Sequence, residues 1–385
     1  MNDPSSWIEI SESAYRKNLR FLRRHIGKDV TLCSVVKANA YGHGLEEFIP
    51  LAERHGVRQF GVFNAEEASE VLACRTADSD IMIMGALADQ DVGWAVENGL
   101  SFWVFDLGRL EVASKAAARC GRPARVHLEV ETGMYRLGLS ARSLGAAARR
   151  IQREPDRLKL KGVCSHFAGA ESSANTHRIE SQLQVYEERL ASLTHMDMSG
   201  FKRHLACSAA AFNYPASIGD MVRFGIAQYG FWPSLETRLL HEARGGRGSA
   251  GQLRRILSWH SRLFNIKTVP TGKFVGYGNS YQTAQKTRIA AVPVGYHHGI
   301  ERSQSNLGHV LVRGMRCPIV GIINMNMMSV DVTRLPKAKV GDEVVIIGHQ
   351  NQDEITVGSF GGRTNDLNYE TLARLHGKLK RVVVA

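Results

Sequence analysis

The sequence predicts a parallel (β/α)8 barrel of the TIM type followed by a mainly β domain. At 385 residues the chain exceeds the usual size of one domain, so two hydrophobic cores are expected. Residues 1–240 alternate short apolar runs with helix-compatible segments, whereas residues 253–385 show strands joined by turns. Because a parallel strand must be covered on both faces, eight such units favour a closed barrel. An open doubly wound sheet remains the alternative, because counting strands does not prove closure.

Each barrel strand is expected where a run of apolar and β-branched residues occurs, in most cases before a segment with helical spacing. The eight runs are residues 31–36, 59–63, 80–84, 100–105, 124–130, 159–167, 203–206 and 222–229. Helix-compatible segments follow at residues 44–55, 65–73 and 176–193. Ahead of the barrel, Trp7-Ile-Glu-Ile predicts a short strand, and Ser11 begins a helix whose apolar positions keep a helical period.

The domain boundary is predicted at residues 241–252, which are rich in glycine and basic residues and have little to bury. Turn signals at Pro270-Thr-Gly and Val340-Gly-Asp separate the strands of the second domain. Those strands are expected at residues 256–268, 287–294, 309–313, 317–323, 329–332 and 343–347. The predicted division is therefore a barrel over 1–240, a linker over 241–252 and a β-domain over 253–385.

The composition excludes several classes of protein. No apolar run reaches the eighteen or so residues of a membrane span and no signal-peptide pattern opens the chain, so we expect a cytoplasmic location and no membrane partner. The six cysteines lack Cys-x-x-Cys spacing, which predicts reduced thiols and no metal site. The net charge of +12 is spread over predicted helical faces without an aromatic-basic motif, so a solvated basic surface is favoured over nucleic-acid binding.

The stretch from Ser34 to Gly44 carries the first chemical signal. Lys37 stands where an apolar strand gives way to small residues, so its amine should reach the crevice at the carboxyl edge of the sheet. Partial desolvation there lowers a lysine pKa from about 10.4 and frees the amine to form a Schiff base. Taken alone, a surface lysine opening a loop would explain Val-Val-Lys. The full string Lys-Ala-Asn-Ala-Tyr-Gly-His-Gly, however, closely resembles the pyridoxal-phosphate lysine motif of the alanine racemase family.

This resemblance extends over essentially the whole chain and implies a barrel plus β-domain. Glu131-Thr-Gly-Met-Tyr-Arg-Leu-Gly is similar to the family segment whose arginine, here Arg136, binds the cofactor's phenolic oxygen and the substrate carboxylate. Family members often carry a carbamylated lysine at the position of Glu129, where its negative charge orients that arginine. We expect the Glu129 carboxylate to do this without carbon dioxide.

Met221-Val-Arg-Phe-Gly-Ile resembles the segment in which an arginine, here Arg223, faces the pyridine nitrogen of the cofactor. An arginine keeps its proton, so the ring nitrogen would stay unprotonated and the cofactor would be a weaker electron sink, which favours racemisation. The resemblance also implies a phosphate cradle. Its matched residues are Ser208, Gly225, Ile226, Tyr41 and Tyr369.

A second base must approach the substrate's α-carbon from the face opposite Lys37. Val275-Gly-Tyr-Gly-Asn-Ser-Tyr resembles the family loop that bears this base, which maps to Tyr277. His166 matches the residue that links that tyrosine to the arginine at the pyridine nitrogen, although a core histidine would have the same spacing. In the family this tyrosine comes from the other subunit, so the resemblance implies a head-to-tail homodimer with two shared sites.

Two further segments match the substrate entrance of the family. They supply Tyr296 and Tyr369, and Met325 is expected to offer its backbone N–H to the substrate carboxylate. Departures from the family pattern cluster in and near these segments and put strict alanine specificity in doubt. The departing residues are Asn324, Asn326, His297, His298 and, in the phosphate cradle, Cys207.

The favoured function is therefore a pyridoxal-phosphate-dependent amino-acid racemase that acts on alanine through Lys37 and Tyr277. A racemase for serine or for a longer or basic amino acid is the second possibility. A related decarboxylase is disfavoured, because that chemistry generally wants an acidic partner at the pyridine nitrogen, where this chain has Arg223. A non-catalytic cofactor carrier, which typically lacks the β-domain, is the alternative from a different class.

Overall fold

The structure, a computed structural model, describes residues 5–194, 200–245, 253–359 and 368–385. It divides into two compact units. We call Tyr15–Lys37 with Ile49–Arg254 the barrel unit, and Met1–Ala14 with Ala38–Phe48 and Arg255–Ala385 the C-terminal unit. Part of the predicted linker, residues 246–252, lies outside the described residues, and the boundaries given above remain a prediction.

The barrel unit holds one eight-stranded parallel sheet in the order β8-β7-β6-β5-β4-β3-β2-β9. Its strands are β2 (Thr31–Val35), β3 (Gln59–Val62), β4 (Asp80–Ile83), β5 (Ser101–Val104), β6 (Ala124–Glu129), β7 (Leu158–Cys164), β8 (Lys202–His204) and β9 (Met221–Phe224). The gap between β8 and β9 is closed by a parallel bridge between Cys207 and Arg223 and by the bond from Asp220 N to Arg203 O at 2.8 Å. The predicted barrel is confirmed, and the open sheet was the wrong alternative.

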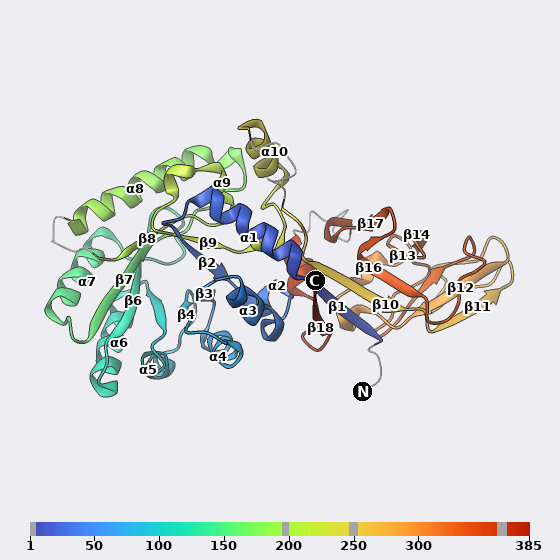
Figure 1. Ribbon diagram of the computed structural model, residues 1–385, viewed down its shortest axis with the longest axis horizontal. Coiled ribbons are helices and arrows are strands. Elements are labelled where there is room, and N and C mark those ends of the chain that lie inside the picture. Colours follow the sequence, from blue (N-terminus) through green and yellow to red (C-terminus); the bar gives the residue numbers. More distant parts are fainter. Residues whose placement is uncertain (1–4, 195–199, 246–252, 360–367) are drawn as a thin grey trace. The chain divides into compact units, whose positions relative to one another are not determined.

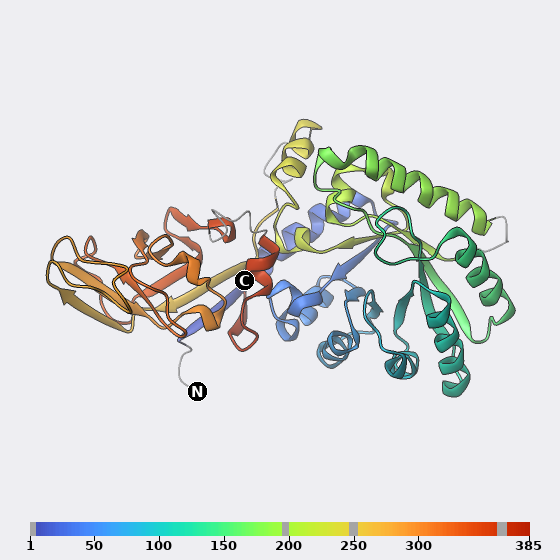
Figure 2. The same cartoon turned by 180° about the vertical axis from the view of Figure 1, so that it is seen from behind.

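Helices surround the strands of the barrel unit (Figures 1 and 2). They are α1 (Glu12–Ile26), α3 (Leu45–Arg54), α4 (Ala65–Cys74), α5 (Asp89–Glu97), α6 (Leu107–Cys120), α7 (Ala141–Arg153), α8 (Thr176–Thr194), α9 (Ser208–Asn213) and α10 (Leu235–Ala243). Five of them begin at a side-chain cap, in which Ser11, Asn64, Asp106, Ser140 or Ser234 accepts a backbone N–H three residues later. Such caps satisfy donors that have no partner inside the helix.

The barrel interior is filled by sulfur-containing and aromatic side chains from five different strands. The buried cluster consists of Cys33, Met82, Trp103, Cys164 and Met221. All six cysteines lie in the described residues, and no disulfide joins any two of them. Because the interior is packed in this way, the functional edge of the barrel is its carboxyl end, where the loops after the strands begin.

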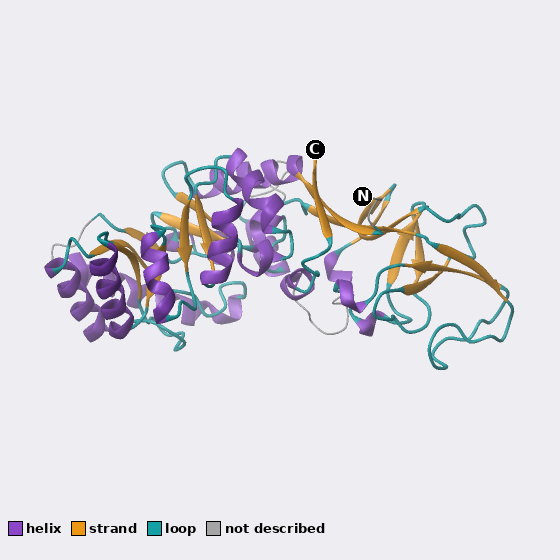
Figure 3. Ribbon diagram, turned by 90° about the horizontal axis from the view of Figure 1, so that it is seen from below, coloured by secondary structure: helices purple, strands orange, loops and turns teal. Residues whose placement is uncertain are grey.

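The C-terminal unit is built from two sheets and few helices (Figure 3). One sheet has the order β14-β13-β16-β10-β1-β18, with β17 paired to β16, and the other has the order β11-β12-β15. The strands are β1 (Ser6–Ser11), β10 (Leu257–Arg262), β11 (Asn265–Val269), β12 (Thr287–Val292), β13 (His309–Val312), β14 (Met315–Pro318), β15 (Met328–Asp331), β16 (Glu343–Gln350), β17 (Asp353–Ile355) and β18 (Lys380–Val384). Strand β1 therefore belongs here, between β10 and β18.

The run expected as one strand over residues 256–268 is two strands in the structure. Leu263 N donates to Asp342 O at 2.9 Å beside the first sheet, while Phe264 N donates to Ala291 O at 3.0 Å in the second. The chain thus passes from one sheet to the other between these two residues. The apolar pattern continues across the passage, which is why the sequence predicted a single strand.

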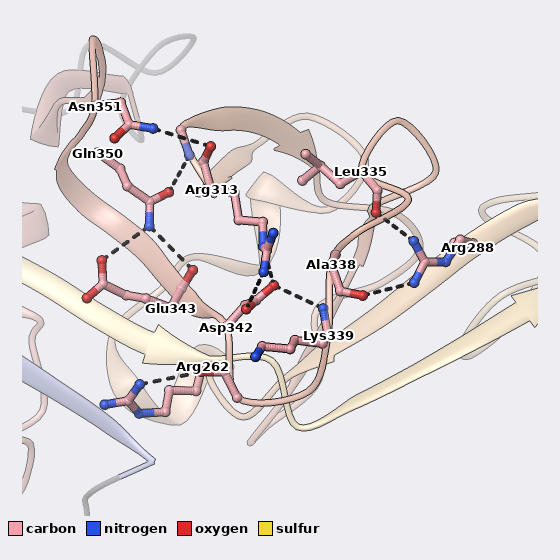
Figure 4. Close-up of polar contacts among 12 residues, drawn as sticks. Arg262, Arg288, Arg313, Leu335, Ala338, Lys339, Asp342, Glu343, Gln350 and Asn351 are labelled. Carbon is pink, nitrogen blue, oxygen red and sulfur yellow. Dashed lines mark hydrogen bonds and ion pairs between the residues drawn. The ribbon is translucent and has the colours of Figure 1, made fainter.

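Side-chain bonds fix the turn that precedes β16 (Figure 4). Arg288 on β12 donates to Leu335 O at 2.6 Å and to Ala338 O at 3.0 Å. Asp342 accepts from Arg313 at 2.7 Å and from the backbone N–H of Lys339 at 2.9 Å. The turn is therefore tied both to β12 and to the end of β13.

The described residues include neither a membrane-spanning helix nor a metal site. Their helices are all too short or too polar to cross a bilayer. Among them, no group of three or more histidine, cysteine, aspartate or glutamate side chains is arranged to hold a metal ion.

Candidate active site

Lys37 stands directly after β2, and the four residues that follow it form a left-handed turn. Ala38, Asn39 and Ala40 each have φ of 54°, and Tyr41 has φ of 52°. Each non-glycine residue in this region costs about 1–2 kcal/mol, because its Cβ crowds the backbone. The loop that carries the candidate cofactor lysine is therefore strained, a property that the sequence did not predict.

Contacts within the loop close this turn. Gly42 N donates to Ala38 O at 3.0 Å, and Gly44 N donates to Asn39 O at 3.0 Å. The Asn39 Oδ1 atom accepts from Leu45 N at 2.9 Å and so satisfies a donor at the start of α3. A short polar side chain is among those that tolerate the left-handed conformation best, which accounts for Asn39 at this position.

The Lys37 amine lies in a surrounding that disfavours its charge. Partial burial lowers its pKa below the ordinary value, Glu67 opposes the shift and Arg136 adds to it. The residue is nevertheless exposed at the end of its strand, so the amine can be reached from solvent. A lysine with a lowered pKa that remains accessible can act both as a nucleophile and as a base.

Arg223 on β9 is buried, with 4% of its surface exposed, and its two terminal nitrogens are fully engaged. One donates to Ser165 O at 2.8 Å and to Leu205 O at 3.2 Å, and the other donates to the backbone oxygen and Nδ1 of His204 at 2.5 and 3.0 Å. The guanidinium also lies over the Trp103 ring at 5.2 Å. Within the described part of the chain, no hydrogen bond uses the Nε–H of Arg223, which leaves that donor for a ligand.

A pair of buried histidines supports Arg223 from inside the barrel, and the sequence reasoning missed both. Since an arginine can only donate, His204 accepts at Nδ1 and must carry its proton on Nε2. That Nε2–H then donates to Nδ1 of His127 at 2.8 Å. Burial lowers the pKa of His127 to about 3 and that of His204 well below its usual value, so both rings stay neutral. Their positions at the inward face of β6 and β8 were the available signal.

The loop after β6 carries Arg136 and is held by a carboxylate. Glu131 accepts from the backbone N–H groups of Gly133, Met134 and Tyr135 at 2.5, 2.9 and 2.9 Å. Arg136 follows this nest and is exposed. In the sequence, Glu131 is only the first residue of the motif that contains Arg136. In the structure, its carboxylate fixes the shape of the loop.

Glu129 ends β6 and is 3% exposed. Its Oε2 atom is buried without a hydrogen-bond partner. Burial raises the pKa of Glu129 to about 7, although Arg136 and then Arg223 act in the opposite direction. The carboxyl therefore faces Arg136 electrostatically, but no direct hydrogen bond joins the two side chains in the described structure.

The candidate phosphate cradle brings together two short helix starts. Ser208, the first residue of α9, accepts from Gly225 N at 3.1 Å through its Oγ atom. Ile226 begins the following short 3-10 helix, Ile226–Tyr229. Backbone donors and a hydroxyl thus converge at the carboxyl end of the barrel, a combination that suits an anion.

His166 follows β7 and is partly buried. Burial lowers its pKa to about 3, with further lowering by Arg223, Arg136 and Lys37. The ring is therefore neutral at physiological pH. The influence of these three charges indicates that His166 faces the same region as Lys37, Arg136 and Arg223.

The remaining candidates belong to the C-terminal unit. Tyr41 and Tyr369 have ring centroids 6.0 Å apart. Tyr296 and Met325 lie on adjoining turns, because Tyr296 N donates to Asn324 O at 3.1 Å and the next amide donates to Met325 O at 2.9 Å. Tyr277 lies on the loop between β11 and β12 and is 71% exposed.

Comparison with known proteins identifies the family. The profile for the alanine racemase N-terminal domain matches residues 10–233, and that for the alanine racemase C-terminal domain matches residues 256–383. An alanine racemase of Leptospira interrogans is 36% identical over 382 residues, which cover 99% of this chain and 96% of that protein.

Solved structures agree with this relation. The alanine racemase of Streptomyces lavendulae has a TM-score of 0.88 and 32% identity, with 100% of this chain and 98% of the other covered. An alanine racemase of Bartonella henselae with covalently bound pyridoxal phosphate has a TM-score of 0.82 and 26% identity, covering 99% and 100% of the two chains. Since both domains match in order and at full length, this chain belongs to the alanine racemase family.

Proposed function

We propose that this chain interconverts L- and D-alanine with pyridoxal phosphate as cofactor and with Lys37 and Tyr277 as the two bases. The observation that carries the proposal is the accessible Lys37 amine, whose pKa is lowered, at the carboxyl end of a barrel strand. The full-length relation to alanine racemases supports the reaction class and substrate. The covalently bound cofactor in the Bartonella henselae relative supports pyridoxal phosphate.

The residues at the barrel edge fit this cofactor. Lys37 would hold its aldehyde carbon, and the free Nε–H of Arg223 would face its ring nitrogen. Ser208, Gly225 and Ile226 would bind its phosphate. We propose that Tyr41 and Tyr369, which lie near each other, complete the phosphate site.

Pyridoxal phosphate, when bound, withdraws electrons from the α-carbon of an amino acid and so acidifies the α-proton. We propose that Nζ of Lys37 removes this proton from one enantiomer and that the phenol oxygen of Tyr277 returns one on the opposite face. The roles reverse for the other enantiomer. Because Arg223 is a permanent donor, it gives no proton to the ring, and the charge left at the α-carbon is short-lived. Rapid reprotonation then favours racemisation over transamination.

The substrate carboxylate needs donors on the same side. Arg136 is proposed to bind it, with Met325 supplying a backbone N–H and with Tyr296 and Tyr369 narrowing the entrance. Glu129 is proposed to orient Arg136 when ionised. Neutral His166 is proposed to support Tyr277 by hydrogen bonding, since its pKa near 3 prevents it from carrying charge itself. The link from His166 to Arg223 that the resemblance implies would require the guanidinium to give up one of the four bonds made by its terminal nitrogens.

The active assembly is proposed to be a head-to-tail homodimer in which Tyr277 serves the partner subunit's site. The high exposure of this side chain in one subunit supports the assignment, because a large aromatic residue on a surface loop suits an interface. A cytoplasmic location remains a prediction from the sequence.

The cofactor and the reaction can be tested separately. The purified protein with pyridoxal phosphate should show an absorbance band near about 420 nm, and borohydride should remove it and leave a label on Lys37. Incubation with L-alanine in deuterium oxide should then give D-alanine with deuterium at the α-carbon. A labelled protein that exchanges no α-proton would be a cofactor carrier and would contradict the racemase assignment.

Specificity is tested by comparing kcat/KM for alanine, serine, lysine and arginine. Alanine is expected to be the best of the four. The unusual entrance residues His297, His298, Asn324 and Asn326 make this comparison informative, because they change the charge and hydrogen bonding near Tyr296. A higher kcat/KM for lysine or arginine would show that these residues redirect the enzyme.

A further inference from the structure

The strained turn after Lys37 is held from outside by a residue near the C-terminus of the chain. Arg381 on β18 is 6% exposed. Its Nε and one terminal nitrogen donate to the carbonyl oxygen of Gly42 at 3.1 and 2.9 Å. Gly42 follows Tyr41, the last of four consecutive non-glycine residues with positive φ. This contact therefore holds the turn at its end.

The rest of the Arg381 guanidinium is bonded to its own end of the chain. It donates to Gly377 O at 2.9 Å, to Leu379 O at 2.7 Å and to His376 O at 3.3 Å. All five N–H donors of the side chain are thereby used on four backbone carbonyls. A lysine ammonium has three donors at one point and could not reach these carbonyls together.

The two glycines of the loop show how closely the C-terminal segment approaches the loop backbone. A Cβ added to Gly42 would lie 2.0 Å from Leu372 O, and one added to Gly44 would lie 2.3 Å from Cδ of Arg381. Both glycines also have positive φ, 77° and 91°. Gly44 therefore leaves room for the Arg381 side chain, Gly42 leaves room for the backbone of Leu372, and local backbone shape favours glycine at both positions.

Keeping this charge inside the protein is costly. The hydrogen bonds of Arg381 go to carbonyl oxygens and not to a carboxylate, and burial lowers its pKa, with only Glu47 acting in the opposite direction. A buried arginine without a bonded counterion is expected where its fork is needed for geometry. Here the geometry is that of the turn between the candidate cofactor lysine and α3.

We propose that Arg381 is a positioning residue for the cofactor: it fixes the left-handed turn at residues 38–41 and thereby sets Tyr41 and the attachment point of Lys37. The proposal rests on the proposed function, since it assigns Arg381 to the affinity for pyridoxal phosphate. Arg381 itself touches neither reacting atom. Its loss should let the strained turn relax, which moves the phosphate-binding phenol and the amine relative to each other.

The experiment compares Arg381→Gln and Arg381→Lys with a matched control, Arg255→Gln. Arg255 is a half-buried arginine of the C-terminal unit whose side chain is 11% exposed, and its bonds go to Leu257 O, Ser258 and Glu354, not to the loop. The measured quantity is the dissociation constant for pyridoxal phosphate, obtained by titrating the cofactor-free proteins and following absorbance. Melting temperature and circular dichroism of the cofactor-free proteins report folding in parallel.

We expect Arg381→Gln to raise the dissociation constant by about 10- to 100-fold, as a displacement of about 1 Å can do, with Arg381→Lys in between. Arg255→Gln should lower the melting temperature but leave the dissociation constant within about twofold. An equal cofactor affinity in Arg381→Gln and wild type, or an equal loss in Arg255→Gln, would overturn the proposal. If Arg381→Gln does not fold, the same comparison is made with Arg381→Lys.

The wild-type titration separates this proposal from the proposed function. If the wild type binds no pyridoxal phosphate, the cofactor assignment itself fails. If the wild type binds and Arg381→Gln binds equally well, only the positioning role of Arg381 fails.

Discussion

The carboxyl of Glu129 titrates at a position where many relatives are expected to carry a carbamylated lysine. Burial raises its pKa from 4.5 to about 7, so the carboxyl is largely neutral in mildly acidic solution and ionised in alkaline solution. The folded protein therefore binds a proton that the unfolded chain has already lost between these two pH values. Stability must fall as the pH rises through this window.

Replacing Glu129 by glutamine should remove this fall in stability with rising pH. In Glu129→Gln the amide does not titrate, so the variant should gain free energy of unfolding relative to wild type as the pH rises from about 4.5 to 7. The relative gain should approach about 3 kcal/mol and then level off. Urea denaturation of the cofactor-free proteins at several pH values measures the difference. A difference that is constant with pH would show that Glu129 has an ordinary pKa.

The same variant tests the role of the carboxylate in catalysis. If ionised Glu129 orients Arg136, Glu129→Gln should lower kcat/KM for alanine by about tenfold above pH 7, and less at acidic pH. Initial rates from pH 6 to pH 9 measure this. Unchanged activity together with an unchanged position of Arg136 would contradict the assignment.

Glu53 provides the opposite case in the barrel unit. Burial acts to raise its pKa, but hydrogen bonds from Ser79 and Thr76 and from the amides of Thr76 and Ala77 outweigh it and lower the pKa below 4.5. Its stabilising contribution is therefore present at neutral pH and is lost as the pH falls through the lowered value.

We expect Glu53→Gln to reduce the free energy of unfolding by about 1–3 kcal/mol at pH 7, because an amide cannot accept all four bonds. The loss should shrink on acidification below pH 4.5, as the pH falls through the lowered pKa of the wild-type carboxyl. Thermal unfolding followed by circular dichroism at pH 7 and at acidic pH measures it. A loss that grows on acidification would reverse the assigned sign.

At the scale of elements, the left-handed turn makes a prediction that runs against the usual effect of glycine. Ala38 is exposed and has φ of 54°, so Ala38→Gly removes the crowding of its Cβ. We expect the free energy of unfolding to rise by about 0.5–1 kcal/mol, less than the strain, because glycine also adds freedom to the unfolded chain.

The matched control is Ala73→Gly in α4, an exposed alanine inside an ordinary helix. That change should lower the free energy of unfolding by about 1 kcal/mol. Urea denaturation of both cofactor-free variants gives the comparison. Loss of stability in both would mean that the turn at Ala38 is not strained.

Most elements could be predicted because they depend on local patterns. The apolar run at residues 31–36 and the cap at Asn64 contain the information that forms β2 and α4. The left-handed turn and β18 could not be found in this way. The turn is held by Arg381, 339 residues away from Gly42, and β18 is defined by pairing with β1.

At the scale of the whole molecule, the proposed sharing of sites between subunits can be tested by complementation. A mixture of Lys37→Ala and Tyr277→Phe proteins, unfolded and refolded together, forms mixed dimers with one doubly altered site and one intact site. An equal mixture should then recover about a quarter of wild-type activity, because about half of the dimers are mixed and each has one working site. Each variant refolded alone is the control. If Tyr277 served its own subunit, no activity would return.

Residues of the candidate site differ in how far the sequence alone could predict them. Candidate residues such as Lys37 and Arg223 could be proposed by resemblance, because the family motifs have fixed positions along the chain. His127, His204 and Arg381 were missed, because their roles come from neighbours that are far away in sequence. Such supporting residues have no local pattern of their own.

The pairing of β1 with β10 and β18 has a consequence for how the protein is made. The ribosome releases β1 before both of its neighbouring strands, the second of which starts at Lys380, so β1 can complete its pairing only after β18 has been synthesised. Arg381 is synthesised together with β18, and only then can its side chain donate hydrogen bonds to Gly42 O. A nascent chain could therefore form barrel strands during translation, and on the proposed role of Arg381 it would bind its proposed vitamin B6 cofactor only weakly until β18 has been synthesised.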